Sequence, residues 1–371
     1  MALLRQANRI VYKFIAKPLF FSIDPEWVHD QITKLGQFWG KSSAVRFLLR
    51  KQYVFDHPML GQEIWGINFK NPVGLAAGFD KDGKIYPLME SVGFGFAEVG
   101  TVTYRPYQGN PKPRLHRLPN SKALVVNYGL KNSGALTVAR LLKNQQKNIP
   151  QVISIGRTNS PDVIKCEDGI TDYLNCFKEF VLADVGDIYE INISCPNTFG
   201  GEPFTGADEL QLLLKAISSF GVKRPIFIKM PINLPWPQFR QLIDVALEFG
   251  VEALVIGNLN KNKRDPAIQD KIPEHINGNI SGQPTKLLSN HLISATYQYC
   301  GDKIKIIGVG GIFSAEDAYE KICRGASLVE LITGMIYEGP QLMAEINEGL
   351  VILLKKDGFK NISEAVGTFR K

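Results

Sequence analysis

The chain has 371 residues, of which 44% are hydrophobic and 21% charged, and its formal net charge is +7. This is ordinary globular composition, with apolar residues for one large core or two smaller ones. The positive charge suits an anionic ligand or membrane surface. Nucleic-acid binding is weakly supported, because the sequence has no dense Lys/Arg stripe with interleaved aromatics. The five cysteines are scattered without a CxxC pair, and the histidines lack metal-ligand spacing. These patterns exclude a disulfide framework and predict a reducing compartment and no metal site.

Residues 1–21 predict a short amphipathic helix. Arg5, Arg9, Lys13 and Lys17 recur every four residues, which places them along one helical face, and apolar residues fill the rest. The apolar runs are too short to span a bilayer, and no cleavable secretory signal is present.

A second helix is predicted to begin at Asp24-Pro25-Glu26, because Asp is a good N-cap and Pro is favoured in the first turn. Gly40 is a plausible stop for this helix. Two such helices with basic and aromatic residues are typical of a hairpin that lies in a membrane interface. A helical lid packed on the main domain explains the pattern equally well.

From about residue 60 onward, short apolar runs alternate with helical segments. The runs are mostly continuous rather than alternating, which is typical of strands buried on both faces. Strands are predicted near residues 73–77, 96–100, 152–156, 188–193, 226–230, 253–257, 304–309 and 327–333. Helices are predicted at residues 85–92, 135–145, 171–182, 208–219, 236–249, 287–299 and 315–324. This order predicts an α/β fold, a (β/α)8 TIM-type barrel with an N-terminal helical extension.

Two excursions interrupt the alternation, at residues 105–117 and at residues 260–285. Long loops on a compact barrel are usually functional lids or mobile segments. We therefore expect both excursions to lie near a functional site.

Polar and glycine residues gather where the predicted strands end. In a barrel of this kind, chemistry is located at the carboxyl ends of the strands. The groups that fall there are Lys81, Thr101, residues 192–197, Lys229, Asn258, residues 308–311, and Thr333-Gly334. Seven of the eight predicted strands thus deliver a ligand-capable group to one rim.

The segment from Asn192 to Asn197 carries the densest chemistry. Two carboxamides flank the Cys195 thiol, and Pro196 stiffens the loop. Two Asn side chains can hold a planar polar ligand by its edges, and the thiol is placed to take a proton or attack a carbon. A polar turn with Cys195 as a small core residue is the alternative.

The glycines at 308, 310 and 311, together with Thr333-Gly334, predict a phosphate site in the loops after strands seven and eight. Lys229 lies inside an apolar strand, and a buried lysine is costly unless it is paired. It is expected to contact an anionic or electron-rich ligand, for which the anionic reduced ring of a flavin is suitable. A lysine that extends to the solvent at a strand end is the alternative.

Five motifs in order, at residues 76–82, 109–114, 192–198, 280–284 and 307–311, make the chain resemble dihydroorotate dehydrogenase. The N-terminal helical pair resembles the membrane-associated, quinone-dependent class of that family. The resemblance runs from about residue 20 to the end of the chain.

The resemblance implies a barrel that carries FMN and oxidises dihydroorotate to orotate in de novo pyrimidine (UMP) biosynthesis, with electrons passed to a membrane quinone. It implies a membrane and quinone-site extension at residues 1–52 and an FMN-binding barrel at residues 53–371. The implied location is peripheral, on the cytoplasmic face of a bacterial inner membrane, with the mitochondrial inner membrane as the alternative.

The family's functional residues are carried over position by position. The resemblance implies FMN contacts from Ala77, Gly78, Thr101, Thr158, Asn192, Lys229, Gly257, Gly282, Gly311, Ile332 and Thr333. It implies substrate contacts from Lys81, Asn127, Tyr128, Gly129, Leu130, Asn192, Asn197, Asn258 and Leu259. Cys195 corresponds to the base that removes the C5 proton, and Arg117 to the arginine at the quinone entrance.

Several positions depart from the family's pattern. Cys195 stands where the quinone-dependent class normally has Ser, and Val126 stands where a substrate-binding Asn is usual. Thr158, Leu259 and Ile332 also differ from the usual residues. A paralogous FMN oxidoreductase acting on another dihydropyrimidine-like substrate is therefore the alternative function.

Two rivals come from other classes. One is a sugar-phosphate aldolase or isomerase that uses Lys229 as a Schiff base. The other is a membrane-bound scaffold protein, which the clustering of polar groups on one rim disfavours.

Overall fold

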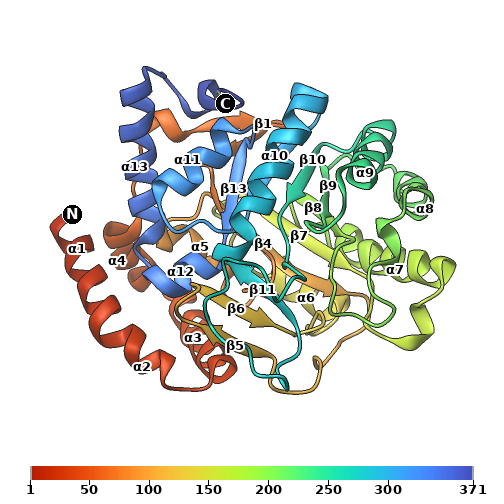
Figure 1. Cartoon of the computed structure of the whole chain (residues 1–371), viewed down its shortest axis with the longest axis horizontal. Helices are drawn as coiled ribbons and strands as arrows, with labels where there is room; N and C mark the ends of the chain where they lie inside the picture. The colour runs from red at the N-terminus through yellow and green to blue at the C-terminus, as the bar shows by residue number, and fades with distance from the viewer. Residues whose placement is uncertain (1, 370–371) are drawn as a thin grey trace.

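The computed structural model describes residues 2–369 (Figure 1). Residues 1, 370 and 371, which belong to the predicted segments 1–52 and 53–371, lie outside the described part.

Within residues 2–369, eight parallel strands close into a barrel in the order β10-β12-β13-β3-β4-β7-β8-β9. Their bounds are β3 (Val73–Leu75), β4 (Phe96–Thr103), β7 (Gln151–Gly156), β8 (Ile188–Asn192), β9 (Ile226–Met230), β10 (Ala253–Ile256), β12 (Lys305–Val309) and β13 (Leu328–Leu331). Every predicted strand is confirmed, and the (β/α)8 prediction is correct. The continuous apolar runs are explained because helices cover the outer face of each strand and other strands close the inner face.

The helices that follow the strands are α5 (Tyr86–Met89), α6 (Ala135–Lys143), α7 (Cys166–Ala183), α8 (Ala207–Ser218), α9 (Trp236–Glu248), α10 (Lys286–Cys300), α11 (Ala315–Cys323), α12 (Thr333–Glu338) and α13 (Leu342–Asp357). The predicted helices are confirmed, whereas α12 and α13 were not predicted. Ser314 caps α11, since its hydroxyl accepts the N–H of Asp317 at 3.3 Å.

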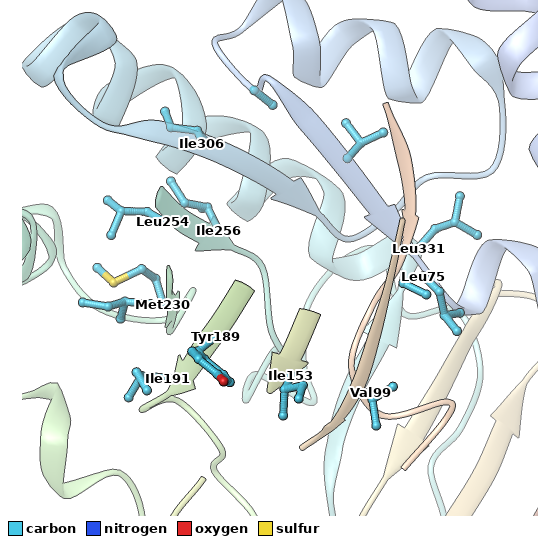
Figure 2. Close-up of a cluster of buried hydrophobic side chains, with 14 of the residues drawn as sticks. Leu75, Val99, Ile153, Tyr189, Ile191, Met230, Leu254, Ile256, Ile306 and Leu331 are labelled. Carbon is cyan, nitrogen blue, oxygen red and sulfur yellow. The ribbon is translucent and has the colours of Figure 1, made fainter. Parts of the chain in front are cut away.

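The main core lies between the barrel and its helices. Figure 2 shows the side chains that point outward from the strands toward this layer, among them Leu75, Ile153 and Leu254. On the inner face, a second cluster that includes Phe96, Ile188, Phe227 and Leu328 fills the amino-terminal end of the barrel.

On four of the barrel strands, the inward-facing residue two positions further along is charged instead of apolar. Because side chains alternate across a strand, the residues that follow Phe96, Ile188, Phe227 and Leu328 on the same face are Glu98, Glu190, Lys229 and Glu330. A buried charged layer therefore separates the apolar floor from the carboxyl end of the barrel.

Two small antiparallel sheets complete the barrel. The hairpin of β1 (Gln62–Ile64) and β2 (Ile67–Phe69) packs on the apolar floor through Phe69. The second sheet has the order β11-β6-β5, from β5 (Leu115–Leu118), β6 (Ala123–Val126) and β11 (Asn279–Gly282). The two excursions expected to be loops thus meet in one sheet at the carboxyl end.

The N-terminal extension consists of α1 (Ala2–Val11), a π-helical turn (Tyr12–Ala16), α2 (Lys17–Phe21), α3 (Pro25–Gly40) and α4 (Ser43–Tyr53). Asp24 caps α3 by accepting the N–H of Trp27 at 2.8 Å, and the helix ends at Gly40 as predicted. The helix α4 was not predicted. Figure 1 shows these helices, in red, on one flank of the barrel beside α12 and α13.

Two residues of the basic face of the first helix, Arg5 and Arg9, contact the barrel. Arg5, which is 6% exposed, pairs with Glu348 at 2.5 Å, and Arg9 lies 3.8 Å from Glu345. The Tyr12 hydroxyl donates to the carbonyl of Ile336 on α12 at 2.7 Å. The extension is therefore anchored to the barrel through its polar side.

The opposite side of the extension presents apolar side chains to the surroundings. Phe14 and Ile15 are 68% and 66% exposed, and Phe38 on α3 is 73% exposed. Among residues 2–369, none of the helices combines the length and the apolar character needed to cross a bilayer. The helical extension thus packs on the main domain and leaves an apolar face uncovered.

We predict that Gly74→Ala destabilises the fold. A Cβ at Gly74 on β3 would lie 2.2 Å from the buried ring of Phe96, so the barrel interior would be overpacked. The expected loss is about 1–3 kcal/mol of unfolding free energy, measured by denaturant or thermal unfolding. Gly61→Ala is the matched control, because its Cβ would meet its nearest atom at an ordinary 3.6 Å. Equal unfolding midpoints for the two variants would contradict this packing argument.

Candidate active site at the carboxyl end of the barrel

A cavity of about 220 Å³ lies at the carboxyl ends of the barrel strands. Most of the residues expected to bind a ligand line it: Ala77, Gly78, Lys81, Thr101, Tyr128, Gly129, Leu130, Asn192, Cys195, Asn197, Lys229, Gly257, Asn258, Leu259, Gly282, Gly311, Ile332 and Thr333. Residues from distant parts of the chain are brought together here, as a barrel rim requires.

A hydrogen-bonded chain of polar side chains forms the floor of the cavity. The Asn192 amide donates to the Thr101 hydroxyl at 2.8 Å, and Thr101 and Ser154 share a hydrogen bond of 2.8 Å. Ser154 in turn donates to Glu190 at 2.5 Å. These contacts fix Asn192 and Thr101, so that their remaining polar atoms have a defined direction.

Lys229 belongs to this floor and lies close to two carboxyl groups. Its Nζ lies 3.2 Å from Glu98 and 3.4 Å from Glu190. Burial alone would lower the pKa of Lys229, but the neighbouring carboxyl groups of Glu190 and Glu98 reverse the effect and raise it well above its ordinary value. A permanently charged ammonium is a poor nucleophile, which argues against the Schiff-base alternative.

One wall of the cavity is exposed backbone. Gly310 and Gly311 have φ values of +101° and +69°. A Cβ on Gly311 would lie 2.4 Å from the Cβ of Lys286, so a side chain has no room there. Thr333, whose hydroxyl lies 3.0 Å from that of Ser281, borders the same wall. Bare backbone with an adjacent hydroxyl is the donor set that phosphate groups prefer.

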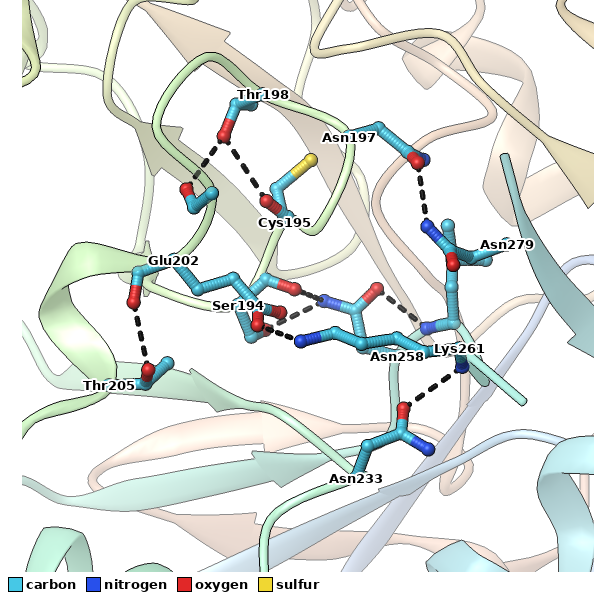
Figure 3. A network of polar contacts seen from close by, with 12 residues as sticks. Ser194, Cys195, Asn197, Thr198, Glu202, Thr205, Asn233, Asn258, Lys261 and Asn279 are labelled. Carbon is cyan, nitrogen blue, oxygen red and sulfur yellow. Dashed lines mark hydrogen bonds and ion pairs between the residues drawn. The ribbon is translucent and has the colours of Figure 1, made fainter. Parts of the chain in front are cut away.

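Hydrogen bonds from Thr198, Asn258 and Asn279 hold the loop that carries Cys195 (Figure 3). The Asn258 amide donates to the carbonyl of Ser194 at 2.7 Å, and Asn279 donates to the Asn197 side chain at 2.7 Å. Thr198 donates to the carbonyl of Cys195 at 3.2 Å. The thiol is therefore held over the cavity by a loop that β10 and β11 help to fix.

The environment of Cys195 favours the neutral thiol. Burial raises its pKa to about 11, and Glu202 adds to this, although the N–H of Asn197 and the charges of Arg157 and Lys229 favour the thiolate. The group is thus a strong base once it has lost its proton.

The extension contributes a residue that the sequence did not single out. His29 on α3 lines the cavity and lies 2.9 Å from the Nζ of Lys81, which sits 3.9 Å from the Tyr128 ring centre. Burial, followed by the charge of Lys131, lowers the pKa of Lys81 to about 8. No local pattern marks His29, because its role depends on how α3 packs.

The cavity has an apolar side formed by the small sheet and α12. Leu115, Leu124, Val126 and Ile336 line it there. A ligand with an apolar body could be accommodated against this side, next to the extension.

Three expected residues do not line the cavity. The hydroxyl and N–H of Thr158 are bonded to Asp172 at 2.7 and 2.6 Å, so Thr158 serves to join strand β7 to α7. Asn127 accepts a hydrogen bond from Asn110 at 3.0 Å. Arg117 donates to the carbonyl of Ile23 at 2.6 Å and is held at the junction of α2 and α3.

Glu98, Glu190 and Glu330 beneath the cavity were also missed. The signal was present, since each is a single acidic residue inside an apolar strand run, as Lys229 is a single basic one. Within residues 2–369, no cluster of three or more His, Cys, Asp and Glu side chains is arranged to hold a metal ion.

The closed (β/α)8 barrel, with a backbone cradle, a paired lysine and a thiol around one cavity, defines a barrel enzyme with its site at the carboxyl ends of the strands. The family model of dihydroorotate dehydrogenase matches residues 59–354. The chain belongs to the dihydroorotate dehydrogenase family, whose members depend on a flavin.

Individual relatives agree with this assignment. A dihydroorotate dehydrogenase (quinone) from Nostoc punctiforme is 39% identical, covering 96% of this chain and 98% of the relative. One from Trichodesmium erythraeum is 36% identical, covering 97% and 99%. The crystal structure of the Eimeria tenella enzyme in complex with ferulenol superposes with a TM-score of 0.82 at 30% identity, covering 93% of this chain and 95% of that one.

The raised pKa of Cys195 predicts slow alkylation at neutral pH. Below the pKa, the reactive thiolate fraction increases about tenfold per pH unit, so labelling by iodoacetamide should accelerate up to about pH 10. Peptide mass spectrometry after timed labelling measures the rate at Cys195 separately from the other cysteines. A rate that levels off near pH 8 would show that the pKa of the Cys195 thiol is not raised.

Proposed function

We propose that this enzyme oxidises dihydroorotate to orotate in pyrimidine biosynthesis and passes the electrons to a quinone. Membership of the dihydroorotate dehydrogenase family supports the reaction. The relatives that match this chain over nearly their full length are named dihydroorotate dehydrogenase (quinone), which supports a quinone as the acceptor. The observation that carries the proposal is the arrangement of Cys195, three Asn side chains and Lys229 around the same cavity as the glycine cradle.

FMN is the flavin that we propose for this cavity, and the residues present fit it. The bare backbone at Gly282, Gly310 and Gly311 and the hydroxyl of Thr333 would hold the phosphate. Lys229 and Thr101 would face the polar edge of the ring. FMN would supply the acceptor for a hydride and a carrier for the two electrons.

The substrate is expected to lie between this floor and the Cys195 loop. Asn192, Asn197 and Asn258 would hold the planar amide edges of the ring, and Lys81 would hold its carboxylate. Asn258 and Asn197 already have one hydrogen bond each to the loop or β11, which sets their direction.

Cys195 is the proposed general base. Dihydroorotate would lose the C5 proton to the Cys195 thiolate, the hydride from C6 would pass to the bound flavin, and a C5–C6 double bond would form. Cys195 and Asn197 of this loop line the cavity, so the loop borders the space in which the substrate would lie. The raised pKa of the thiol means that its base form is scarce at neutral pH, so proton removal should become faster as the pH rises.

The extension at residues 1–52 is the proposed membrane and quinone-site segment, and residues 53–371 are the proposed FMN-binding barrel. The apolar side of the cavity, at Leu115, Leu124 and Ile336, is beside the extension, and Arg117 is fixed at the junction of α2 and α3. We propose that the quinone enters here from a membrane on which the exposed apolar side chains rest. The proposed location is the cytoplasmic face of a bacterial inner membrane.

Anaerobic addition of dihydroorotate to the purified yellow protein tests the proposed reaction. Absorbance near 450 nm, where oxidised flavins absorb, should fall and should recover when a quinone analogue is added. Cys195→Ala should retain the flavin and slow the bleaching by at least about 100-fold, without slowing reoxidation by the quinone. Bleaching by another dihydropyrimidine but not by dihydroorotate would overturn the substrate assignment.

Membrane docking is tested with liposomes. Phe14 and Phe38 present exposed apolar rings on the extension, so Phe14→Asp and Phe38→Asp should each reduce co-sedimentation with phospholipid vesicles several-fold. Leu287→Asp is the matched control, because Leu287 is 77% exposed on α10 rather than on the extension. Equal losses for all three variants would argue against a docking face on the extension.

A further inference from the structure

A layer of buried charge lies beneath the cavity. Glu98, Glu190 and Glu330 are at most 1% exposed, and Lys229 is 5% exposed. Glu98 belongs to β4, Glu190 to β8, Glu330 to β13 and Lys229 to β9. The other barrel strands contribute Ser154 on β7, Val255 on β10, Ile307 and Val309 on β12, and Gly74 on β3, so within residues 2–369 this layer holds three carboxyl groups and one ammonium.

The layer does not contain enough donors for three carboxylates. Glu98 Oε2 accepts from Lys229 at 3.2 Å and from the N–H of Ala77 at 2.6 Å, and Glu190 Oε1 accepts from Ser154 at 2.5 Å. Glu98 Oε1, Glu190 Oε2 and Glu330 Oε2 are buried without a hydrogen-bond donor. Buried carboxylate oxygens in a native protein are almost always hydrogen-bonded, so the missing donors call for an explanation.

Two protons on the cluster supply the missing donors. If all three carboxyls were ionised, the layer would carry a net charge of −2 in a dry interior, which is strongly unfavourable. With two of them protonated the net charge is zero. Glu98 keeps a buried oxygen without a donor, and it is the neighbour that raises the pKa of both Glu190 and Glu330, so the O–H of each acid would have Glu98 as its acceptor.

We infer that Glu190 and Glu330 lie beneath the cavity as uncharged carboxylic acids and position Lys229, leaving its positive charge to act on an anion bound above. The inference rests on the proposed function for the identity of that anion, the carboxylate-bearing substrate or an electron-rich cofactor. Glu98 is then the single counter-ion of Lys229.

The acidities of the two groups agree with this assignment. Burial and the neighbouring Glu98 raise the pKa of Glu190 to about 8 and that of Glu330 well above its ordinary value. Both groups are therefore neutral at pH 7, and Glu190 is expected to ionise as the pH rises through about 8.

The protonation of Glu190 and Glu330 determines whether Lys229 can attract an anion in the cavity. A fully ionised cluster would outweigh the ammonium and repel any anion in the cavity. With two protons in place, the field at the cavity floor is that of an ion pair whose positive end faces the ligand. Glu190 and Glu330 are positioning residues in this account, because they act through Lys229 and not on the substrate.

Infrared spectroscopy of the holoenzyme tests the inference directly. The wild type at pH 7 should show carboxylic-acid C=O absorption from buried groups, and Glu190→Gln and Glu330→Gln should each remove part of it. Raising the pH to about 9.5 should remove the Glu190 part from the wild type. Glu316→Gln, at an exposed position in the first turn of α11, should leave the absorption unchanged.

Orotate binding, followed by the flavin spectrum, provides the functional readout. Between pH 7 and about pH 9.5, the wild type should lose about tenfold more affinity for orotate than Glu190→Gln, since only the wild type gains a negative charge beneath the site. Lys81 also titrates near pH 8, but it is present in both proteins and cancels in the comparison.

Absence of the acid absorption in the wild type at pH 7 overturns the inference, and that measurement needs no variant to fold. Superimposable pH profiles for wild type and Glu190→Gln overturn it as well. Failure of dihydroorotate to bleach the flavin would instead count against the proposed function, and the infrared result would be unaffected.

Discussion

The pairing of Lys229 with Glu98 and Glu190 is the interaction on which the site depends. An ammonium inside a barrel is tolerated only with a counter-charge at hydrogen-bond distance, which Glu98 on β4 provides at 3.2 Å, while the Glu190 carboxyl on β8 lies 3.4 Å away. The same contacts connect through Ser154 and Thr101 to Asn192, so one hydrogen-bonded chain sets the floor of the cavity. Closure of the barrel is what brings these strands together, and the floor therefore exists only in the complete fold.

Much of the barrel could be predicted from the sequence, because its signals are local. Continuous apolar runs such as residues 253–257 define strands, and Asp24 and Ser314 mark helix starts through hydrogen bonds that span three residues. The position of polar groups at strand ends then follows from the rule that parallel strands deliver their carboxyl ends to one rim. The sequence therefore predicts Lys229, Cys195 and Asn258 at one rim, and all three line the cavity.

The rest depends on contacts between distant segments. Local periodicity does not predict three such contacts. These are the pairing of β6 with β11, the contact of His29 with Lys81 and the hydrogen bond of Thr158 with Asp172. The basic stripe of the first helix shows the same limit, because its spacing predicted a polar face but not the side on which that face would lie. The acidic partners on α13 are what hold Arg5 and Arg9 against the barrel.

The three-stranded sheet also determines when the cavity wall can form during folding. Strands β5 and β6 are neighbours in sequence and can pair early, but β11 follows six of the eight barrel strands along the chain. Loop-closure entropy delays such non-local pairing. The wall that holds Leu115, Leu124 and Gly282 is therefore assembled late, and a ligand bound against it would stabilise the last step of folding rather than the first.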